Sequence, residues 1–392
     1  MKRRNARNPA RWLRPALQAA FLTVTAYAIV RHRAGEAAGL EGARNPAPGV
    51  DSLSPFGGLE TLWPFITTGK LLNHLHASDL VLFAAAALVA LLLGGAFCGW
   101  ICPFGAIQEW LYALRRKVWR REIELPARVD RLLRYGRYLV LVLVLGATYS
   151  TGELIFGEYC PWRAAWHLGG NEVAIGGVAV LGLVVVGGLL VERAWCRYAC
   201  PLGAVLGLAN LVAPVKLRRS EPTCTGCSLC NRKCPMGLKI DGVEQVSDTT
   251  CIRCLDCADS CPRPDTLNAR LGGRPVKTWF YGAAAAVLFT GVIGGAMVTG
   301  NWQSTAAAVP PPAAGGLPDT EEIKGWRTLQ EISNLWEIPL ETLYGGLGLD
   351  PAAFPAATTK VKDLEGQVAP DGQAIDRTYV KALVDQWLAV NR

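Results

Sequence analysis

The chain contains two cysteine-rich stretches with the same spacing, Cys224-Thr-Gly-Cys227-Ser-Leu-Cys230-Asn-Arg-Lys-Cys234-Pro235 and Cys251-Ile-Arg-Cys254-Leu-Asp-Cys257-Ala-Asp-Ser-Cys261-Pro262. In each, three cysteines follow one another at intervals of three residues, and a fourth cysteine comes four residues later, directly before a proline. The two stretches hold eight of the 13 cysteines in the chain. A regular spacing that occurs twice indicates a set of metal ligands.

This spacing is typical of a module that binds two [4Fe–4S] clusters, as in bacterial ferredoxins. Three thiolates in a tight loop can bind three iron corners of one cubane, and the cysteine before proline leaves the loop to bind the other cluster. The sequence therefore predicts two ligand sets: Cys224, Cys227, Cys230 and Cys261 for the first cluster, and Cys251, Cys254, Cys257 and Cys234 for the second.

Zinc and disulfide bonds are the alternative interpretations of these cysteines. Zinc sites usually use two CxxC pairs with a long spacer and lack the CxxCxxC triplet. Disulfides are disfavoured because the distribution of charge, described below, puts this segment in the reducing cytoplasm. Iron–sulfur binding is the favoured interpretation.

The composition indicates a membrane protein. The 392 residues include 51% hydrophobic and 18% charged residues, with a mean hydropathy of +0.22. A soluble chain carries about 25% charged residues. The chain is too long for a disulfide-dense secreted scaffold, and four histidines argue against a multi-haem protein.

Five stretches are apolar enough to be membrane spans. A span needs about 20 apolar residues and at least roughly 17, so flanking residues must extend the first and third stretches. The predicted spans are Pro15 to Val30, Leu80 to Phe97, Tyr138 to Gly152, Val173 to Val191 and Thr278 to Gly300.

Charge alternates between the segments that separate these spans. One side carries 28 Lys and Arg against 12 Asp and Glu, whereas the other carries 12 against 20. Positive residues favour the cytoplasmic side. We therefore expect a multi-pass protein of the cell inner membrane, with the N-terminus and the iron–sulfur segment cytoplasmic and the C-terminus extracytoplasmic. The net charge of +8 reflects this topology, and no nucleic-acid partner is expected.

The first apolar stretch could instead belong to a signal peptide, since basic residues precede it. However, Arg31-His32-Arg33 follows Val30 where a cleavage site would have small residues. A retained anchor is the favoured interpretation.

The ends of the second and fourth spans repeat one motif, Ala96-Phe-Cys98-Gly-Trp-Ile-Cys102-Pro103 and Ala194-Trp-Cys196-Arg-Tyr-Ala-Cys200-Pro201. Residues four apart share a helix face, and both spans run from outside to inside. The four-span region thus contains a parallel internal repeat, a known membrane arrangement. We expect an additional redox or metal site formed by Cys98, Cys102, Cys196 and Cys200; the alternative is that these small residues pack helices.

The C-terminal segment after the last span is acidic. Thr328 to Glu331 fits a helix capping box, and two further short helical patterns follow, at Ile338 to Leu347 and Tyr379 to Val390. A DNA-binding role is excluded by its acidity and its extracytoplasmic side. It is either a docking module for an extracytoplasmic partner or a folded cap.

The predicted fold is mainly α: a polytopic membrane helix bundle of about five spans, with an inserted α+β bacterial 2[4Fe–4S] ferredoxin-like module and a small helical C-terminal domain. The expected parts are a basic cytoplasmic N-terminus (1–14), a four-span region with two CxxxCP repeats (15–216), the cytoplasmic ferredoxin-like domain (217–276), the fifth span (277–300), a Pro/Ala linker (301–318) and an extracytoplasmic helical domain (319–392).

Several polar residues on the extracytoplasmic side are weaker candidates. His74 and His76 could contact a quinone head group or a haem, and four others could accept protons released on quinol oxidation: Glu60, Glu153, Glu158 and His167. Cys160 is alone on that side, which favours a packed thiol.

These motifs resemble the membrane polyferredoxin family that includes NapH and NosR, proteins of electron transfer and maturation in nitrate and nitrous oxide respiration. The resemblance rests on the two CxxxCP motifs and the two cysteine quartets, and it covers about Leu13 to Thr299. NosR-type proteins carry a large extracytoplasmic flavin-binding domain before the spans, and the segment from Arg31 to Asp79 is too short for one. The resemblance implies two [4Fe–4S] clusters, a quinone and a partner redox protein or ferredoxin.

Two functions are consistent with these motifs and this topology. The favoured one is electron transfer between the membrane quinone pool and a partner redox protein, in a direction that the sequence leaves open. The alternative is a redox-sensing maturation or regulatory protein for an extracytoplasmic metalloenzyme. A transporter is disfavoured because no charged residue lies in the middle of a span, and no catalytic motif of the chain's own is evident.

Overall fold

The computed structural model describes residues 10–37, 48, 53–68, 77–119, 125–151, 156–166, 175–263, 265–302, 320, 323, 325, 327–357, 359–364 and 366–391. The described chain is mainly helical and forms two compact units, Met1–Ala307 and Ala308–Arg392. Each unit has its own hydrophobic core.

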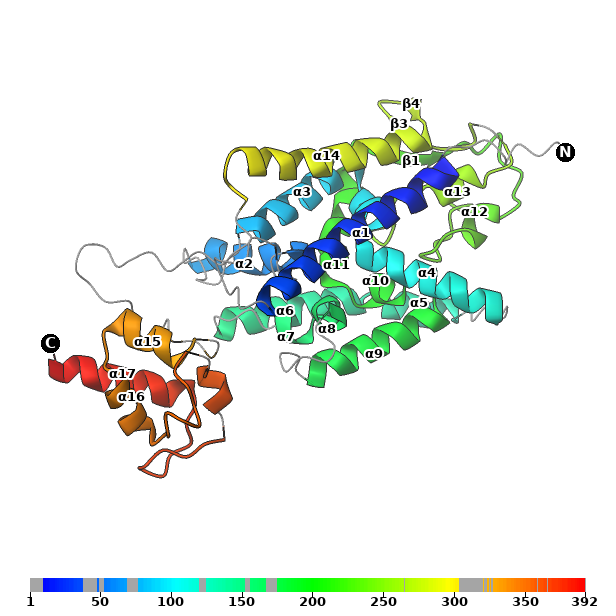
Figure 1. Ribbon diagram of the computed structural model, residues 1–392. Helices are drawn as coiled ribbons and strands as arrows, with labels where there is room; N and C mark the ends of the chain where they lie inside the picture. The colour runs from blue at the N-terminus through cyan, green and yellow to red at the C-terminus, as the bar shows by residue number, and fades with distance from the viewer. Residues whose placement is uncertain are drawn as a thin grey trace. The chain divides into compact units, whose positions relative to one another are not determined.

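Within the described residues, three helical segments of the first unit are long and apolar enough to cross a membrane (Figure 1). Trp12–Gly35 lies within α1 (Ala10–Ala37), Ala127–Ser150 covers α5 (Ala127–Leu133) and α6 (Gly136–Thr151), and Thr278–Val298 is α14. They overlap the first, third and fifth predicted spans.

The second and fourth predicted spans coincide with shorter apolar helices, α3 (Ala77–Leu93) and α9 (Ile175–Leu190). A residue with positive φ follows each helix closely, Gly94 at 77° and Arg193 at 54°. Because this conformation cannot continue a right-handed helix, α3 stops earlier than hydropathy alone predicts.

Each of these helices leads into a pair of helices that carries a CxxxCP motif. In the first half, the π-helix η3 (Phe97–Ile101) is followed by α4 (Pro103–Val118). In the second half, α10 (Ala194–Tyr198) is followed by α11 (Pro201–Val212). The motif proline is the first residue of α4 and of α11, where its missing N–H costs nothing.

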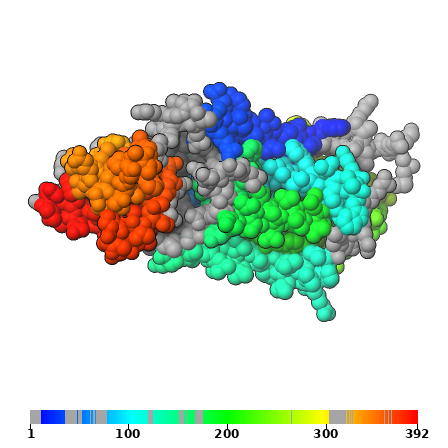
Figure 2. Space-filling view, turned by 60° about the horizontal axis from the view of Figure 1, so that its bottom comes forward, coloured from blue at the N-terminus to red at the C-terminus, as the bar shows by residue number. Residues whose placement is uncertain are grey.

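Three further helices of this unit are described outside the cysteine-rich module, and they are short or lie beside α3. They are α2 (Pro55–Thr68), α7 (Phe156–Tyr159) and α8 (Pro161–Trp166). α1, α4 and α9 pack side by side and appear together on one face of the unit (Figure 2).

Residues 215–276 form an α+β module, as the sequence predicts for a ferredoxin. Its antiparallel sheet has the order β2-β1-β3-β4, with β1 at Val215–Arg219, β2 at Gln245–Val246, β3 at Leu267–Leu271 and β4 at Arg274–Val276. The single-turn helices α12 (Leu229–Arg232) and α13 (Asp256–Asp259) follow the two CxxCxxC loops.

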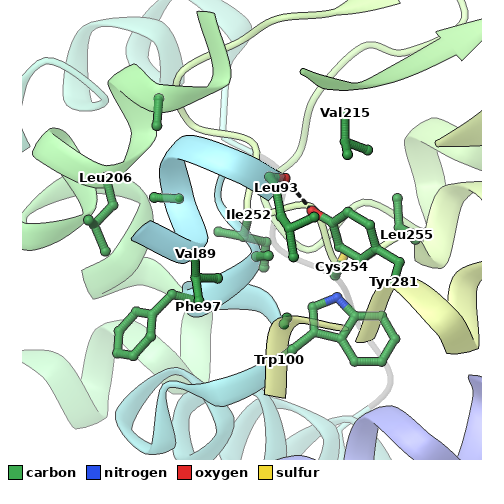
Figure 3. Close-up of a cluster of buried hydrophobic side chains, with 14 of the residues drawn as sticks. Val89, Leu93, Phe97, Trp100, Leu206, Val215, Ile252, Cys254, Leu255 and Tyr281 are labelled. Atoms are coloured by element: carbon green, nitrogen blue, oxygen red, sulfur yellow. Dashed lines mark hydrogen bonds between the residues drawn. The ribbon is translucent and has the colours of Figure 1, made fainter. Parts of the chain in front are cut away.

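This module shares one hydrophobic core with the membrane helices. Figure 3 shows Trp100 and Tyr281 beside Cys254 and Leu255 of the second loop. The Tyr281 hydroxyl donates a hydrogen bond to the Leu93 carbonyl, at the end of α3. The module is therefore built into the helix bundle.

The second unit is a small helical fold with its own core. α15 (Leu329–Trp336), α16 (Leu340–Leu347) and α17 (Arg377–Asn391) surround the buried Trp336 together with the 3-10 helix η6 (Val361–Leu364). The predicted capping box is present: the Glu331 N–H donates to the Thr328 hydroxyl, and the Thr328 N–H donates to the Glu331 carboxylate.

The packing of α14 on the first CxxxCP motif yields a prediction. A Cβ added at Gly282 would overlap the indole ring of Trp100. A Cβ added at Gly291 on the same helix would meet no other group within 4 Å. Overpacking a core costs about 1–3 kcal/mol. We expect Gly282→Ala to lower the free energy of unfolding by about this amount in a detergent-solubilised denaturation experiment, and Gly291→Ala to leave it unchanged; equal effects would contradict the packing.

Candidate functional site

The first CxxCxxC loop surrounds a hollow of about 380 Å³ at the surface of the module. Its lining includes the four cysteines predicted to share the first cluster, which we call the solvent-side set: Cys224, Cys227, Cys230 and Cys261. Cys224 and Cys227 precede α12, Cys230 lies within α12, and Cys261 comes from the residues after α13. Cys227 is exposed to solvent.

The second loop surrounds a hollow of about 300 Å³ inside the shared core. Its lining includes the four cysteines predicted for the second cluster, the core-side set: Cys234, Cys251, Cys254 and Cys257. The side chains of Cys254 and Cys257 are only 7% and 5% exposed. The crosswise arrangement expected from the spacing thus brings each set of four cysteines together.

Both loops have the same backbone conformation around the second cysteine. φ is positive at Gly226 and Ser228 in the first loop, and at Arg253 and Leu255 in the second. For a non-glycine residue this costs about 1–2 kcal/mol, and such strain is concentrated at functional sites. Turns in which residues of right- and left-handed conformation alternate are a backbone arrangement that favours anions.

The thiol of Cys227 reflects this environment. Hydrogen bonds from the Leu229 N–H and from the Thr225 hydroxyl lower the pKa of Cys227 below its ordinary value. A thiolate is the form that binds metal. This part of the loop therefore favours the ligand form at Cys227, whereas burial raises the pKa of Cys230.

The geometry suits a multinuclear cluster better than one zinc ion. Among the described residues, no three His, Cys, Asp or Glu side chains converge on a point that a single ion could occupy. Tetrahedral zinc would need four thiolates about 2.3 Å from one centre. A cubane has its irons at separate corners, so its thiolates stand around a hollow.

Arg253 supplies a buried cation at the core-side hollow. Its side chain is 1% exposed and lines the hollow. Its Nε donates to Asn210 and one terminal nitrogen donates to the Val215 carbonyl, but the other terminal nitrogen has no hydrogen-bond partner among the described residues. A buried donor of this kind is costly when unpaired, and it fits an anionic iron–sulfur cluster whose sulfurs accept hydrogen bonds.

Asn210 on α11 joins the membrane helices to the core-side loop. Its Oδ1 accepts hydrogen bonds from the Gly95 N–H at 3.0 Å and from Arg253 Nε at 3.1 Å. Its Nδ2 donates to the Cys251 carbonyl at 2.7 Å and to the Asp248 carbonyl at 3.1 Å. This fully buried amide therefore has all its main hydrogen-bonding positions in use.

The two CxxxCP motifs also come together. The membrane-face set consists of Cys98, Cys102, Cys196 and Cys200, all of which are partly buried, and its members lie close enough for their charges to interact. The second cysteine of each motif has the same local role, because Cys200 Sγ accepts the Gly203 N–H at the start of α11 and Cys102 Sγ accepts the Gly105 N–H at the start of α4. The repeat seen in the sequence is therefore a repeat in three dimensions.

A buried ion-pair network, which was not predicted from the sequence, lies beside this set. Glu109 Oε2 on α4 accepts hydrogen bonds from Arg14 at 2.7 Å and from Arg193 at 2.8 Å. Arg193 is fully buried and also donates to the Cys98 carbonyl at 2.7 Å. Arg14, which the sequence places in the basic N-terminus, further pairs with Asp256 of α13. The one available signal was Glu109 itself, a carboxylate in an otherwise apolar turn.

The candidates on the predicted extracytoplasmic side are only partly described. Glu60 is buried, and its carboxylate accepts hydrogen bonds from the Thr148 hydroxyl at 2.8 Å and the Phe156 N–H at 3.1 Å. Burial raises the pKa of Glu60. Cys160 lies in an apolar cluster with Phe56 and Phe156. The candidates His74, His76, Glu153 and His167, and the side chain of Glu158, lie outside the described residues.

Comparison with known proteins identifies the family. A family model for a 4Fe-4S binding domain matches twice, at residues 75–122 and 173–220, and each match contains one CxxxCP motif. The putative electron transport protein YccM of Escherichia coli is 30% identical over 274 residues, which are 65% of this chain and 75% of YccM. The chain belongs to the ferredoxin-type membrane electron-transport proteins.

Two further relatives define the range of this family. The ferredoxin-type protein NapH of Haemophilus influenzae is 29% identical over 50% of this chain and 71% of its own length. The regulatory protein NosR of Pseudomonas aeruginosa is 34% identical over 46% of this chain, but only 26% of its own length is matched. No solved structure matches the chain.

Asn210 provides a test of how the site is built. Asn210→Ala would leave buried partners on Gly95 and Arg253 unsatisfied, which costs about 1–3 kcal/mol for each group. We expect a loss of about 2–4 kcal/mol in the free energy of unfolding. Asn268→Ala, on the sheet of the same module, is the control and should change stability by less than about 0.5 kcal/mol; similar losses in both variants would contradict a central role for Asn210.

Proposed function

We propose that the chain is an integral membrane iron–sulfur protein that transfers electrons between the quinone pool and a partner redox protein. The observation that carries the proposal is the crosswise grouping of eight cysteines around two hollows in a module built into membrane helices. A [4Fe–4S] cluster exchanges one electron and makes or breaks no substrate bond. Electron transfer, in a direction not yet assigned, is therefore the chemistry that this arrangement supports.

In this proposal the solvent-side set and the core-side set each hold one [4Fe–4S] cluster. The backbone N–H groups of the two loops and the unpaired nitrogen of Arg253 would face the anionic clusters. The exposed position of Cys227 gives a soluble partner access to one end of the module. The buried position of Cys254 and Cys257 keeps water away from the other end.

The membrane-face set is the proposed additional redox or metal site. Two observations support it: the four thiols are close to one another, and the 4Fe-4S family model matches the two segments that contain them. Helix packing alone would not require a cysteine at all four equivalent positions of the repeat. Four thiols from two motifs could hold a further iron–sulfur centre or form redox-active pairs.

We also propose the five-span topology, with the N-terminus and the module in the cytoplasm. The start of α1 contacts the module through Arg14 and Asp256, and the start of α14 contacts it through Thr278 and Asp259 at 2.8 Å. Figure 1 shows both helix starts at the same end of the first unit as the sheet. This arrangement agrees with the excess of basic residues on the cytoplasmic side.

The crosswise assignment of the cysteines predicts which variants share a spectroscopic defect. Purified protein should contain about eight irons and eight sulfides in its two ferredoxin sites. Cys224→Ser and Cys261→Ser should alter the same EPR signal of the reduced protein, and Cys251→Ser and Cys234→Ser should alter the other. Cys160→Ser is the control and should alter neither. Zinc without acid-labile sulfide, or a Cys261→Ser defect shared with Cys251→Ser, would overturn the assignment.

The link to the quinone pool rests on Glu60, whose raised pKa makes it a better proton acceptor than an exposed carboxylate. We expect a reduced quinol analogue to bleach the cluster absorbance of the wild-type protein. Glu60→Gln should slow this reaction about 100-fold and leave reduction by dithionite unchanged. Glu341→Gln on α16 is the control. Equal rates in wild type and Glu60→Gln would remove Glu60 from the proposal.

A regulatory function is the second candidate, because one relative carries the name regulatory protein NosR. In that case the clusters would report redox state, and the C-terminal unit would pass the signal to an extracytoplasmic metalloenzyme. Steady turnover separates the two functions. Protein in nanodiscs that passes many electrons from quinol to an artificial acceptor supports electron transfer, whereas a single reduction without turnover supports regulation.

A further inference from the structure

The two CxxxC motifs contact the core-side set in different ways. The three residues between the cysteines are Gly99, Trp100 and Ile101 in the first motif, and Arg197, Tyr198 and Ala199 in the second. A core-side cluster would take three ligands from one segment, Cys251 to Cys257, and one from another, Cys234. Each motif reaches one of these two ligand segments.

The first motif packs against the three-cysteine segment. A Cβ at Gly99 would overlap the Ile252 carbonyl oxygen, so only glycine allows the two backbones to come this close. The indole N–H of Trp100, which is fully buried, donates to the Arg253 carbonyl at 3.1 Å. Both contacts fall between Cys251 and Cys254.

The second motif packs against the residues that follow Cys234. The guanidinium of Arg197 lies against Gly237, where a Cβ would overlap it. Arg197 pairs with Asp130, which also accepts a hydrogen bond from Tyr198 at 2.7 Å. Arg134 pairs with Asp130 in turn and donates to the Met236 and Gly237 carbonyls at 3.0 Å.

The solvent-side set lies farther from the bundle. Its loop has exposed residues at Thr225, Gly226 and Cys227, and Arg232 donates to the Cys227 carbonyl at 3.4 Å from within the module. The contacts that join the module to the two CxxxC motifs come instead from residues on either side of the core-side hollow.

From this we infer an order along the molecule: the core-side set is the neighbour of the membrane-face set, and the solvent-side set is the outer end. We propose that Trp100 and Arg197 are positioning residues, which hold the two ligand segments of the core-side cluster against the two CxxxC motifs. This rests on the proposed assignment of two [4Fe–4S] clusters. The partly buried guanidinium of Arg197 also brings a positive charge close to Cys234, and a nearby cation stabilises the more negative, reduced form of a cluster.

The test is a redox titration of the full-length protein, with the two clusters followed separately by EPR. Cys224→Ser first identifies the solvent-side signal. Arg197→Gln should then lower the midpoint potential of the core-side cluster by about 59 mV, a tenfold change in its reduction equilibrium, and leave the solvent-side cluster unchanged. Arg197→Lys keeps the charge, so the midpoint potential of its core-side cluster should stay close to the wild-type value. A purely structural role would not predict this difference between the two variants.

Trp100→Phe keeps an aromatic ring and removes the hydrogen bond to the Arg253 carbonyl, so it should alter only the core-side signal. The controls are Trp110→Phe, at an exposed position of α4, and Arg232→Gln, in the solvent-side loop; neither should move the core-side potential. Cys196→Ser in the membrane-face set should shift the core-side potential alone.

The outcomes separate this inference from the proposed function. Wild-type protein without iron and sulfide would end the proposed function itself. Protein with both clusters in which Arg197→Gln and Trp100→Phe shift neither cluster, or shift the solvent-side cluster equally, would overturn the order. If Arg197→Gln does not assemble its clusters, Trp100→Phe decides the question by the same criterion.

Discussion

The close contact between the core-side loop and the membrane helices is the constraint on which the rest of the structure depends. Backbone meets backbone here, because Gly95 and Gly99 lie against the carbonyls of Cys251 and Ile252 and leave no room for a side chain. Asn210 then ties both surfaces together with buried hydrogen bonds. The module can therefore keep its position only if the helix ends of the repeat keep theirs. Gly94, whose φ is positive, ends α3 directly before this contact.

Buried charge is the second consequence of this contact. Arg193 and Arg253 are almost completely buried, yet a burial of this kind is expensive unless partners are present. Glu109 pairs with two arginines through one carboxylate, and one terminal nitrogen of Arg253 has no hydrogen-bond partner among the residues that the structure describes. Arg253 lines the core-side hollow. An anionic cluster in that hollow would supply the missing acceptor, so Arg253 and the cysteines support the same interpretation.

The sequence predicted the parts whose determinants are local. Cysteine spacing alone was enough to assign Cys234 and Cys261 to opposite hollows, and proline after cysteine marked the starts of α4 and α11. The pairing of Arg14 with Glu109 joins residues 95 positions apart and depends on how α1 docks, which no local pattern encodes. Positive φ at Leu255 and Arg193 was also hidden, because neither residue type prefers it. Hydropathy placed five apolar stretches but missed the early end of the second, since Gly94 stops α3 at Leu93 within a run that remains apolar to Phe97.

The two CxxxC motifs have cysteines at the same positions but different residues between those cysteines. The local turn and the contacts with the core-side set explain these two properties. The four cysteines occupy equivalent positions because each motif builds the same turn from a helix end into a proline-led helix. The intervening residues differ because the core-side set presents two unlike surfaces. Against the tight loop from Cys251 to Cys254, the first motif needs the small Gly99. Beside Cys234, where the chain turns at Gly237, the second motif has space for Arg197 and fills it with a cation. An internal repeat can therefore contact a cluster with a three-plus-one ligand set only after its two halves have diverged at these positions.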